Sequence, residues 1–287
     1  MKFNRSNPPA SPIDYLALGH ITRDITSDGL QIGGTVSYSS LTALSFGLRV
    51  GIVTAIPEDL DTSPLEPVAL MTVQSENVST FENIQTPNGR VQVLHLKAED
   101  IQMEDIPTIW RDTPIIHLGP LCGELDPHII QEFPNSFIGV TPQGWLRTWD
   151  DAGHVRLGDW PEADLILKNA SAVIFSIEDV HHDENRIEEL IPKGRILVVT
   201  EGAAGARVYW NGDVRHFKAP HVELIESTGA GDIFAATFFI RLAQTQDPWE
   251  AARCAVRIAS TSVTRARLAG APTPEEIRTV LTEIISD

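Results

Sequence analysis

The residues best suited to chemistry form one short run, Ser227-Thr228-Gly229-Ala230-Gly231-Asp232. Two glycines allow the backbone to approach a bound group closely, and the apolar residues 233–240 predict that a buried helix begins directly after them. The first N–H groups of a helix lack intrahelical partners, so they suit an anion and above all a phosphate. Asp232 adds a carboxylate that could act as a base. Together these groups are what phosphoryl transfer to a hydroxyl needs.

The same run has a simpler interpretation. A Gly-x-Gly turn before a helix is often only a tight connection, and an Asp in a first turn is often only a cap that matches the helix dipole. The six residues alone favour neither interpretation. The placement of the other polar residues must decide between them.

The composition is that of a globular protein with a sizeable core. The chain has 287 residues, of which 42% are hydrophobic and 21% charged. The net charge of −17 repels polyanions, which argues against nucleic acid and anionic membranes as partners. A small phosphorylated ligand stays compatible with this charge, because local donors govern its site.

The remaining composition signals concern the compartment. Cys122 and Cys254 are far apart and in no metal-type spacing, which indicates a reducing environment. Residues 1–12 lack the apolar core of a signal peptide, and no later run is long and apolar enough to span a membrane. We therefore expect a cytoplasmic protein whose first ten or so residues are mobile.

The elements that must position the motif alternate between strand and helix. Buried strands are expected at 14–19, 50–56, 113–119, 137–141, 172–175, 195–200 and 221–225. Helices are expected at 33–48, 126–133, 177–191, 229–244, 248–265 and 274–286. This alternation predicts a doubly wound, mainly parallel α/β sheet with helices on both faces.

Short strands and hairpins interrupt the alternation. Residues 21–32 suit exposed strands, and Asn88-Gly89 predicts a hairpin between 78–84 and 90–96. A second hairpin is expected around Asn211-Gly212, and residues 142–159 read as a long irregular stretch. We expect a single domain, 1–287, with a small β lid built from about 21–33 and 78–97.

Polar or glycine-rich segments follow several of the expected strands. These segments are 19–24, Gly33-Gly34, Ser176, 200–205 and 228–232. Ligands of such sheets bind at the carboxyl ends of the strands. The convergence of these segments at one edge favours the phosphoryl-transfer interpretation.

With these features in order, the chain resembles the ribokinase-like (PfkB) sugar kinases over about residues 14–270. The resemblance implies a doubly wound α/β domain with a small β lid over the sugar. Residues 228–232 match the most specific signature of the family. By this resemblance Asp232 is the base, and Gly229, Ala230 and Gly231 form the anion hole.

Other segments match the family in turn. Residues 19–24 match its N-terminal segment, which implies that Asp24 holds sugar hydroxyls, as a carboxylate can. Gly33 and Gly34 match the Gly-Gly pair of the family, whose backbone lies close to the bound sugar. The resemblance places the ATP phosphates near a further group of residues: Thr200, Gly202, Gly205, Thr228 and Ser176.

Four positions depart from the family pattern. Tyr38 stands where an Asn commonly contacts substrate, and Val256 where an Asn or His often contacts adenine. Ser176 and Asp179 replace the Asn and Glu that organise Mg²⁺, so Asp179 is the expected metal residue. Glu226 stands where the family usually has an Asp, so the sequence leaves undecided whether a monovalent cation binds.

Residues 38, 79–83 and 143–147 are similar to a branch that includes plant inositol kinases. Gln143 and Arg147 are expected ligand contacts beside Tyr38, because an Arg at the strand ends could hold a phosphate. The alternative is that Arg147 packs over Trp145 or Trp149 at the surface.

Two histidine signals are not assigned to chemistry. His181 and His182 point to different sides of an expected helix and suit a solvated first turn. His117 lies in an expected strand and suits a hydrogen-bonded core position.

The sequence thus predicts an ATP-dependent, Mg²⁺-assisted kinase for a small sugar or cyclic polyol. A nucleoside kinase of the same family is one alternative, since Tyr38 or Phe81 could stack a base. A non-catalytic ligand-binding protein on the kinase scaffold is the other. Exposed lid strands can pair between subunits, so a homodimer through the lid is compatible with the sequence.

Overall fold

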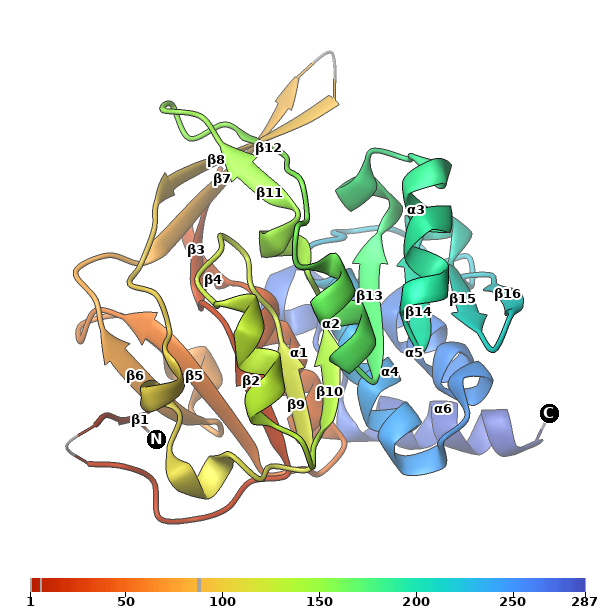
Figure 1. Ribbon diagram of the computed structural model, residues 1–287, viewed down its shortest axis with the longest axis horizontal. Helices are drawn as coiled ribbons and strands as arrows, with labels where there is room; N and C mark the ends of the chain where they lie inside the picture. The colour runs from red at the N-terminus through yellow and green to blue at the C-terminus, as the bar shows by residue number, and fades with distance from the viewer. Residues whose placement is uncertain (1, 6, 87–88, 287) are drawn as a thin grey trace.

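A ten-stranded sheet runs through the centre of the molecule (Figure 1). The computed structural model describes residues 2–5, 7–86 and 89–286. In spatial order the strands are β1 (Lys2–Phe3), β6 (Ala69–Gln74), β5 (Val50–Ile56), β2 (Tyr15–Leu18), β9 (Ile115–Leu118), β10 (Phe137–Val140), β13 (Ala172–Ser176), β14 (Ile196–Thr200), β15 (Ala206–Trp210) and β16 (Asp213–Phe217). Strands β1 to β14 in this order are parallel, and β15 and β16 add an antiparallel edge.

Helices cover both faces of this sheet (Figure 1). One layer contains α1 (Thr35–Ser45), α4 (Ala230–Thr245), α5 (Pro248–Ser262) and α6 (Pro274–Ser286). The other contains α2 (Ala163–Asn169), α3 (Glu184–Leu190) and the 3₁₀ helix Pro127–Glu132. Alternate residues of β2 divide between the two layers: Leu16 packs with the second layer and Ala17 with the first. The prediction of a doubly wound α/β fold is confirmed.

A four-stranded sheet projects from one end of the central sheet (Figure 1). Its order is β4 (Gly29–Gly33), β3 (Thr22–Thr26), β7 (Ser79–Thr86) and β8 (Gly89–Leu96). Strands β7 and β8 pair antiparallel as expected, while Pro87 and Asn88 of the expected turn lie outside the described residues. These strands fall in the two ranges from which the lid was expected.

A further hairpin extends this sheet. It consists of β11 (Arg147–Trp149) and β12 (Val155–Leu157). The Leu94 amide donates to the Gly153 carbonyl at 2.8 Å, and Val93 forms a bridge with His154. The hairpin therefore carries Arg147 on an ordered extension of the projecting sheet, where the sequence had predicted an irregular stretch.

The buried His20 ties this projecting sheet to the core. Its Nε2–H donates to the Glu99 carbonyl at 2.9 Å, and its Nδ1 forms a hydrogen bond with the Ser79 hydroxyl at 2.7 Å. The Ser79 oxygen also accepts from the Ala98 amide. The Glu124 carboxylate accepts from the amides of His20, Leu121 and Cys122. Both ends of the β7–β8 hairpin are thus fixed to the loops after β2 and β9.

Several expected elements were wrong. Residues 221–225 form no strand: Leu224 and Ile225 are exposed, and the Ile225 amide donates to the Val263 carbonyl beyond the end of α5 at 2.8 Å. The expected helix 177–191 is broken at His181 and His182, whose positive φ angles of 52° and 58° separate the 3₁₀ helix Ile177–Val180 from α3. Residues 126–133 form a 3₁₀ helix, and the N-terminal segment contributes β1.

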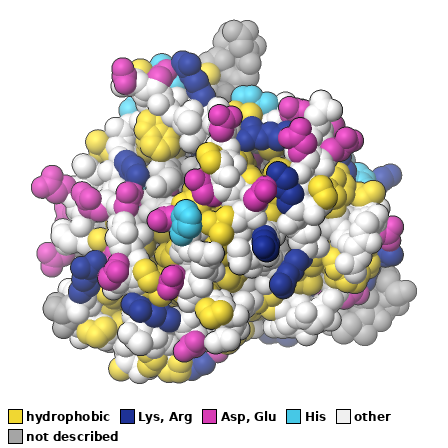
Figure 2. All heavy atoms as spheres, in the orientation of Figure 1, with side chains coloured by type: hydrophobic (Ala, Val, Ile, Leu, Met, Phe, Trp, Pro, Cys, Tyr) yellow, Lys and Arg dark blue, Asp and Glu magenta, His cyan; other side chains and the backbone are white. Residues whose placement is uncertain are grey.

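Figure 2 shows acidic and basic side chains interspersed over the face it presents. No helix in the described part of the chain combines the length and the apolar character needed to cross a membrane.

Candidate active site

Asp232 lies where the starts of helices α1 and α4 meet. It occupies the first turn of α4, and the Thr35 hydroxyl at the start of α1 donates to its Oδ1 at 2.7 Å. Burial raises the pKa of Asp232 to about 6; the Thr35 hydrogen bond opposes this shift, Asp179 adds to it, and the Arg147 charge opposes it. The carboxylate is therefore a base whose pKa lies near neutrality, which is the range that general base catalysis favours.

Gly229 makes the turn that starts α4. Its φ is 82°, in the left-handed region, and a Cβ atom at this position would lie 2.3 Å from Cδ1 of Tyr38. The turn is closed by a hydrogen bond from the Ile233 amide to the Gly229 carbonyl at 2.9 Å. The first amides of α4, including those of Gly231 and Asp232, start a helix whose N-terminal N–H groups lack intrahelical partners. This is the local geometry that an anion requires.

The Tyr38 ring packs against this turn. Its side chain is 2% exposed and packs with Ile233, Ile258 and Ile277. Burial raises the pKa of the Tyr38 hydroxyl, and the charges of Asp232, Asp24 and Glu226 add to that effect. The ring packs against Gly229, and the substrate contact expected of Tyr38 stays a prediction.

Asp24 and the glycine pair form a second polar group. Asp24 lies on β3 opposite Gln31 of β4, and a Cβ on Gly33 would lie 2.4 Å from its Oδ2. A Cβ on Gly34 would lie 2.5 Å from the His20 carbonyl, so the pair allows the strand to pass close to both groups. Burial raises the pKa of Asp24 to about 6; a hydrogen bond from Thr22 opposes this shift, and the Glu226 charge adds to it.

Because the folded-state pKa of Asp24 exceeds its ordinary value of 3.8, its ionisation costs stability. The native state binds more protons than the unfolded state between about pH 4 and 6, so stability falls as pH rises through this window. We expect Asp24→Asn to raise the free energy of unfolding at pH 7 by about 1–3 kcal/mol. Urea unfolding at pH 4 and pH 7 checks this, since the gain must shrink at the lower pH. A variant less stable than the wild type at pH 7 would contradict it.

The third group surrounds Asp179. Its Oδ2 accepts from the Ser176 amide at 2.9 Å in a capping box, and its Oδ1 accepts from Gln143 Nε2 at 3.0 Å. Arg147 Nη2 lies 3.9 Å from the same Oδ1. Since Asp179 and Arg147 both shift the pKa of Asp232, this group lies within electrostatic reach of it. The structure thus directs Arg147 toward the two carboxylates.

The expected nucleotide turn follows β14. Thr200 pairs in register with Ser176 on β13, and a 3₁₀ turn, Gly202–Ala204, follows it. A hydrogen bond from the Glu201 amide to the Gly205 carbonyl closes the turn. Thr228 lies exposed in the loop before α4. Thr200 and Ser176 therefore end neighbouring strands, as the sequence predicted.

Val256 and His117 have structural positions. Val256 is 5% exposed and packs in the core between α5 and the central sheet. His117 bonds to the Tyr15 hydroxyl at 2.7 Å and to the Thr141 hydroxyl at 3.0 Å. Burial lowers the pKa of His117 to about 3, so the ring stays neutral. The expectation of a hydrogen-bonded core histidine is confirmed.

Sequence reasoning missed Thr35 and Arg267. Arg267 donates to Asp28 at 2.8 Å and to Thr26 at 3.2 Å, which joins the tip of the β3–β4 hairpin to the segment after α5. Its charge lowers the pKa of Asp24. Thr35 follows Gly33-Gly34 directly, and this adjacency was the available signal for it.

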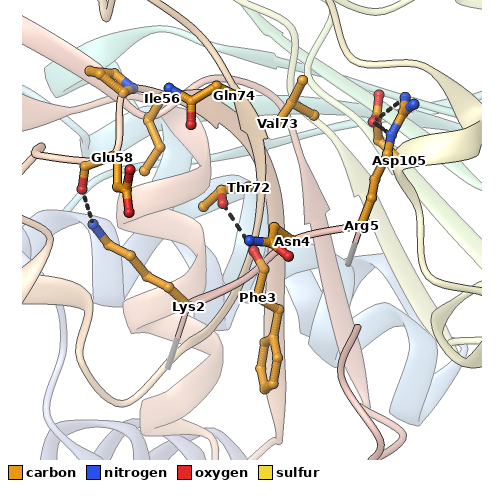
Figure 3. Close-up of a pocket in the computed structure, with 11 residues that line it drawn as sticks. Lys2, Phe3, Asn4, Arg5, Ile56, Glu58, Thr72, Val73, Gln74 and Asp105 are labelled. Atoms are coloured by element: carbon orange, nitrogen blue, oxygen red, sulfur yellow. Dashed lines mark hydrogen bonds and ion pairs between the residues drawn. The ribbon is translucent and has the colours of Figure 1, made fainter. Parts of the chain in front are cut away.

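A separate hollow of about 640 Å³ lies beside the N-terminal strand (Figure 3). Lys2 donates to the Glu58 carbonyl at 3.3 Å, and Arg5 pairs with Asp105 along its rim. None of the expected site residues lines it. The candidate active site is the region around Asp232.

Comparisons with known proteins find carbohydrate kinases. The family described as pfkB family carbohydrate kinase matches residues 160–275, which include the start of α4. The chain is 31% identical over 123 residues to inositol 3-kinase of Zea mays, covering 41% of this chain and 31% of that protein. It is 44% identical over 160 residues to a fructokinase of Escherichia coli, covering 50% and 51%.

A third relative is a probable chloroplastic fructokinase-6 of Arabidopsis thaliana, 32% identical over 114 residues, with 37% of this chain and 29% of that protein covered. The chain thus spans about a third of the length of the first curated relatives it matches.

The structural likeness extends over nearly the whole chain. A pyrophosphate-dependent kinase in the ribokinase family, complexed with a pyrophosphate analog and myo-inositol, has a TM-score of 0.78 at 19% identity, covering 92% of this chain and 99% of that one. Ribokinase of Arabidopsis thaliana, complexed with ribose and ATP, has a TM-score of 0.71 at 14% identity, covering 94% and 99%. At these identities the likeness establishes the fold.

Proposed function

We propose that the chain is an ATP-dependent kinase of the pfkB carbohydrate kinase family that phosphorylates a hydroxyl of a small sugar or cyclic polyol; the family match over residues 160–275 and the ribokinase-like fold support this. The observation that carries this proposal is the position of Asp232. A carboxylate with a pKa of about 6 lies in the first turn of α4, directly after the glycine turn at Gly229. A base and an anion site within one helical turn suit transfer of a phosphoryl group to a hydroxyl.

In the proposed reaction the γ-phosphoryl group of ATP lies over the first amides of α4. Asp24 accepts hydrogen bonds from acceptor hydroxyls, and Asp232 takes the proton of the attacking hydroxyl. The new bond joins the acceptor oxygen to the γ-phosphorus, and the bond from that phosphorus to ADP breaks. Arg147 stabilises charge on the transferred group, which a guanidinium can contact through two donors. Thr200 and Ser176 end neighbouring strands on the ATP side.

Asp179 is the residue that would hold Mg²⁺. The fit rests on its carboxylate, which Gln143 and the Ser176 amide orient beside Arg147 and within electrostatic reach of Asp232. Mg²⁺ prefers oxygen ligands and is commonly bound by one or two carboxylates together with substrate phosphates. When bound, the ion offsets phosphate charge.

The four-stranded sheet with the β11–β12 hairpin is the proposed lid. The four-stranded sheet is built from about residues 21–33 and 78–97. Its strand β3 carries Asp24, and strand β11 of the hairpin carries Arg147. Closing the lid over the acceptor would exclude water and suppress ATP hydrolysis. Leu30 on β4 is 57% exposed and Leu96 on β8 is 47% exposed, which supports a homodimer through this sheet.

The acceptor is proposed to be unphosphorylated. Asp24, Glu226 and Asp232 are close enough for their charges to act on Tyr38, and Arg267 is paired with Asp28. A phosphate on the acceptor would meet this group of carboxylates at close range and be repelled. Neutral hydroxyls instead donate hydrogen bonds to carboxylates.

Pyrophosphate is the alternative donor. Val256 offers adenine no polar group, since it is apolar and buried in the core, and the structural neighbour that holds myo-inositol is a pyrophosphate-dependent kinase. A kinase assay tests both proposals with ATP or pyrophosphate against neutral sugars, inositols, nucleosides and sugar phosphates. We expect ADP release that depends on a neutral sugar or polyol. Turnover of nucleosides alone would favour a nucleoside kinase, and nucleotide binding without turnover would favour a non-catalytic protein.

The pH dependence follows from Asp232. Because the base must be ionised and its pKa is about 6, we expect kcat/KM to fall about tenfold per pH unit below pH 6 and to level off above pH 7. Rates measured between pH 5 and pH 8 with the preferred acceptor check this expectation. A rate independent of pH over that range would show that no group with this pKa limits the reaction.

A further inference from the structure

Thr35 contacts Asp232 across 197 positions of sequence. It is the first residue of α1 and is 3% exposed. Its hydroxyl donates to Asp232 Oδ1 at 2.7 Å, an ordinary distance for a well-formed O–H···O hydrogen bond. The two residues start helices α1 and α4, which pack against each other. The position of the carboxylate is thus tied to the start of a second helix.

The packing around Thr35 fixes the direction of its hydroxyl. A β-branched side chain has few rotamers, so the place of the methyl group determines the place of the oxygen. A Cβ on Gly119 would lie 2.6 Å from the Thr35 methyl carbon Cγ2, so the glycine provides the space that this methyl group occupies. Gly119 is itself held by a hydrogen bond from its amide to the Leu18 carbonyl at 2.9 Å. The central sheet therefore fixes the position of the Thr35 methyl group, and that position fixes the direction of the hydroxyl.

We propose that Thr35 is a positioning residue for Asp232: it holds Oδ1 and leaves Oδ2 to take the proton of the acceptor hydroxyl. The inference rests on the proposed phosphoryl transfer. A carboxylate free to rotate about its last bond would present either oxygen in many directions. One fixed donor removes this freedom, and misplacement of a reacting group by about 1 Å can reduce a rate about 100-fold.

The hydrogen bond also favours the ionised form of the base. It lowers the pKa of Asp232 and so opposes the effect of burial. Without the donor, a larger share of Asp232 would be protonated near neutral pH. Thr35 therefore has two consequences that can be measured separately, one on the geometry of the transfer and one on its pH dependence.

Thr35→Val and Thr35→Ser form a matched pair. Valine keeps the shape and loses the donor, whereas serine keeps the donor and loses the methyl group that directs it. We expect Thr35→Val to lower kcat roughly 10- to 100-fold with little change in the KM for the acceptor, and to move the acid limb of the pH profile up by about one unit. Thr35→Ser should retain the wild-type acid limb and lose less than about tenfold in kcat.

A readout without turnover separates this inference from the proposed function. Urea unfolding between pH 4 and pH 7 should show a larger loss of stability with rising pH in Thr35→Val than in the wild type, because the folded-state pKa of Asp232 rises further. That difference should vanish when both proteins also carry Asp232→Asn.

If the wild type is active and Thr35→Val has the same kcat and the same acid limb, the inference about Thr35 is wrong while the proposed function stands. Equal impairment of both variants with an unshifted acid limb would assign Thr35 a purely structural role and also overturn it. A wild-type protein inactive toward every acceptor and donor would refute the proposed function, and the positioning role with it.

Discussion

Asp232→Asn is expected to lower kcat for phosphoryl transfer by about 10³-fold, within the range that a general base contributes. Asparagine has the same shape and can still accept from the Thr35 hydroxyl, but it cannot take a proton from the attacking hydroxyl. The KM values for ATP and acceptor should change little, since the loss concerns the transition state. Steady-state kinetics with the preferred acceptor measure both parameters.

The matched control for this change is Asp164→Asn. Asp164 is on α2, pairs with Lys193 and has a side chain that is 78% exposed. The Asp164→Asn variant carries the same chemical change outside the proposed active site, so its kcat should equal that of the wild type. Because burial raises the pKa of Asp232, Asp232→Asn should also be at least as stable as the wild type at pH 7. Near wild-type turnover by Asp232→Asn would refute the role of Asp232 as the base.

Gly229→Ala is expected to reduce kcat by at least about 100-fold, the scale of losing one donor of an anion site. The φ of 82° disfavours any side chain, and the new Cβ would lie 2.3 Å from the Tyr38 ring. Tyr38 cannot move aside, because it is packed against Ile233 and Ile258. The turn itself must shift, which moves the first amides of α4 away from the phosphoryl group. We also expect a stability loss of about 1–3 kcal/mol.

Gly231→Ala is the control for backbone geometry. A Cβ on Gly231 meets no atom within 4 Å, and alanine favours a helix more than glycine does. This variant should be as stable as the wild type or more so, in contrast to Gly229→Ala. Thermal unfolding of both proteins measures the difference. Equal stability of the two variants would show that the contact between Gly229 and Tyr38 does not restrict the turn.

The parts of the site that could be predicted depend on local rules. The start of α4 was visible in the sequence, since glycines before an apolar run predict a turn into a buried helix from local residues alone. Ser176 and Thr200 were found because they end buried parallel strands, whose carboxyl ends meet at one edge of the sheet, whereas Gly33-Gly34 was found through the resemblance. The fold class followed from the same alternation.

The parts that could not be predicted depend on distant partners. Thr35 meets Asp232 only because α1 and α4 pack together, so its place directly after Gly33-Gly34 could mark it as a site residue but could not reveal its partner. Tyr38 has the size and polarity of a ligand contact, but its place beneath Gly229 is decided by the packing of α1 against α4 and α5. Residues 221–225 alternate like a strand, yet the Ile225 amide bonds to the Val263 carbonyl after α5 instead of to a neighbouring strand.

The stoichiometry of a single reaction tests the central claim most directly. The protein would be incubated with ATP, Mg²⁺ and its preferred acceptor, and the products resolved by ³¹P NMR. The proposed mechanism predicts one phosphomonoester of the acceptor for each ADP formed, with little inorganic phosphate. ADP accompanied mainly by inorganic phosphate, or bound ATP that is never consumed, would contradict phosphoryl transfer to an acceptor hydroxyl at Asp232.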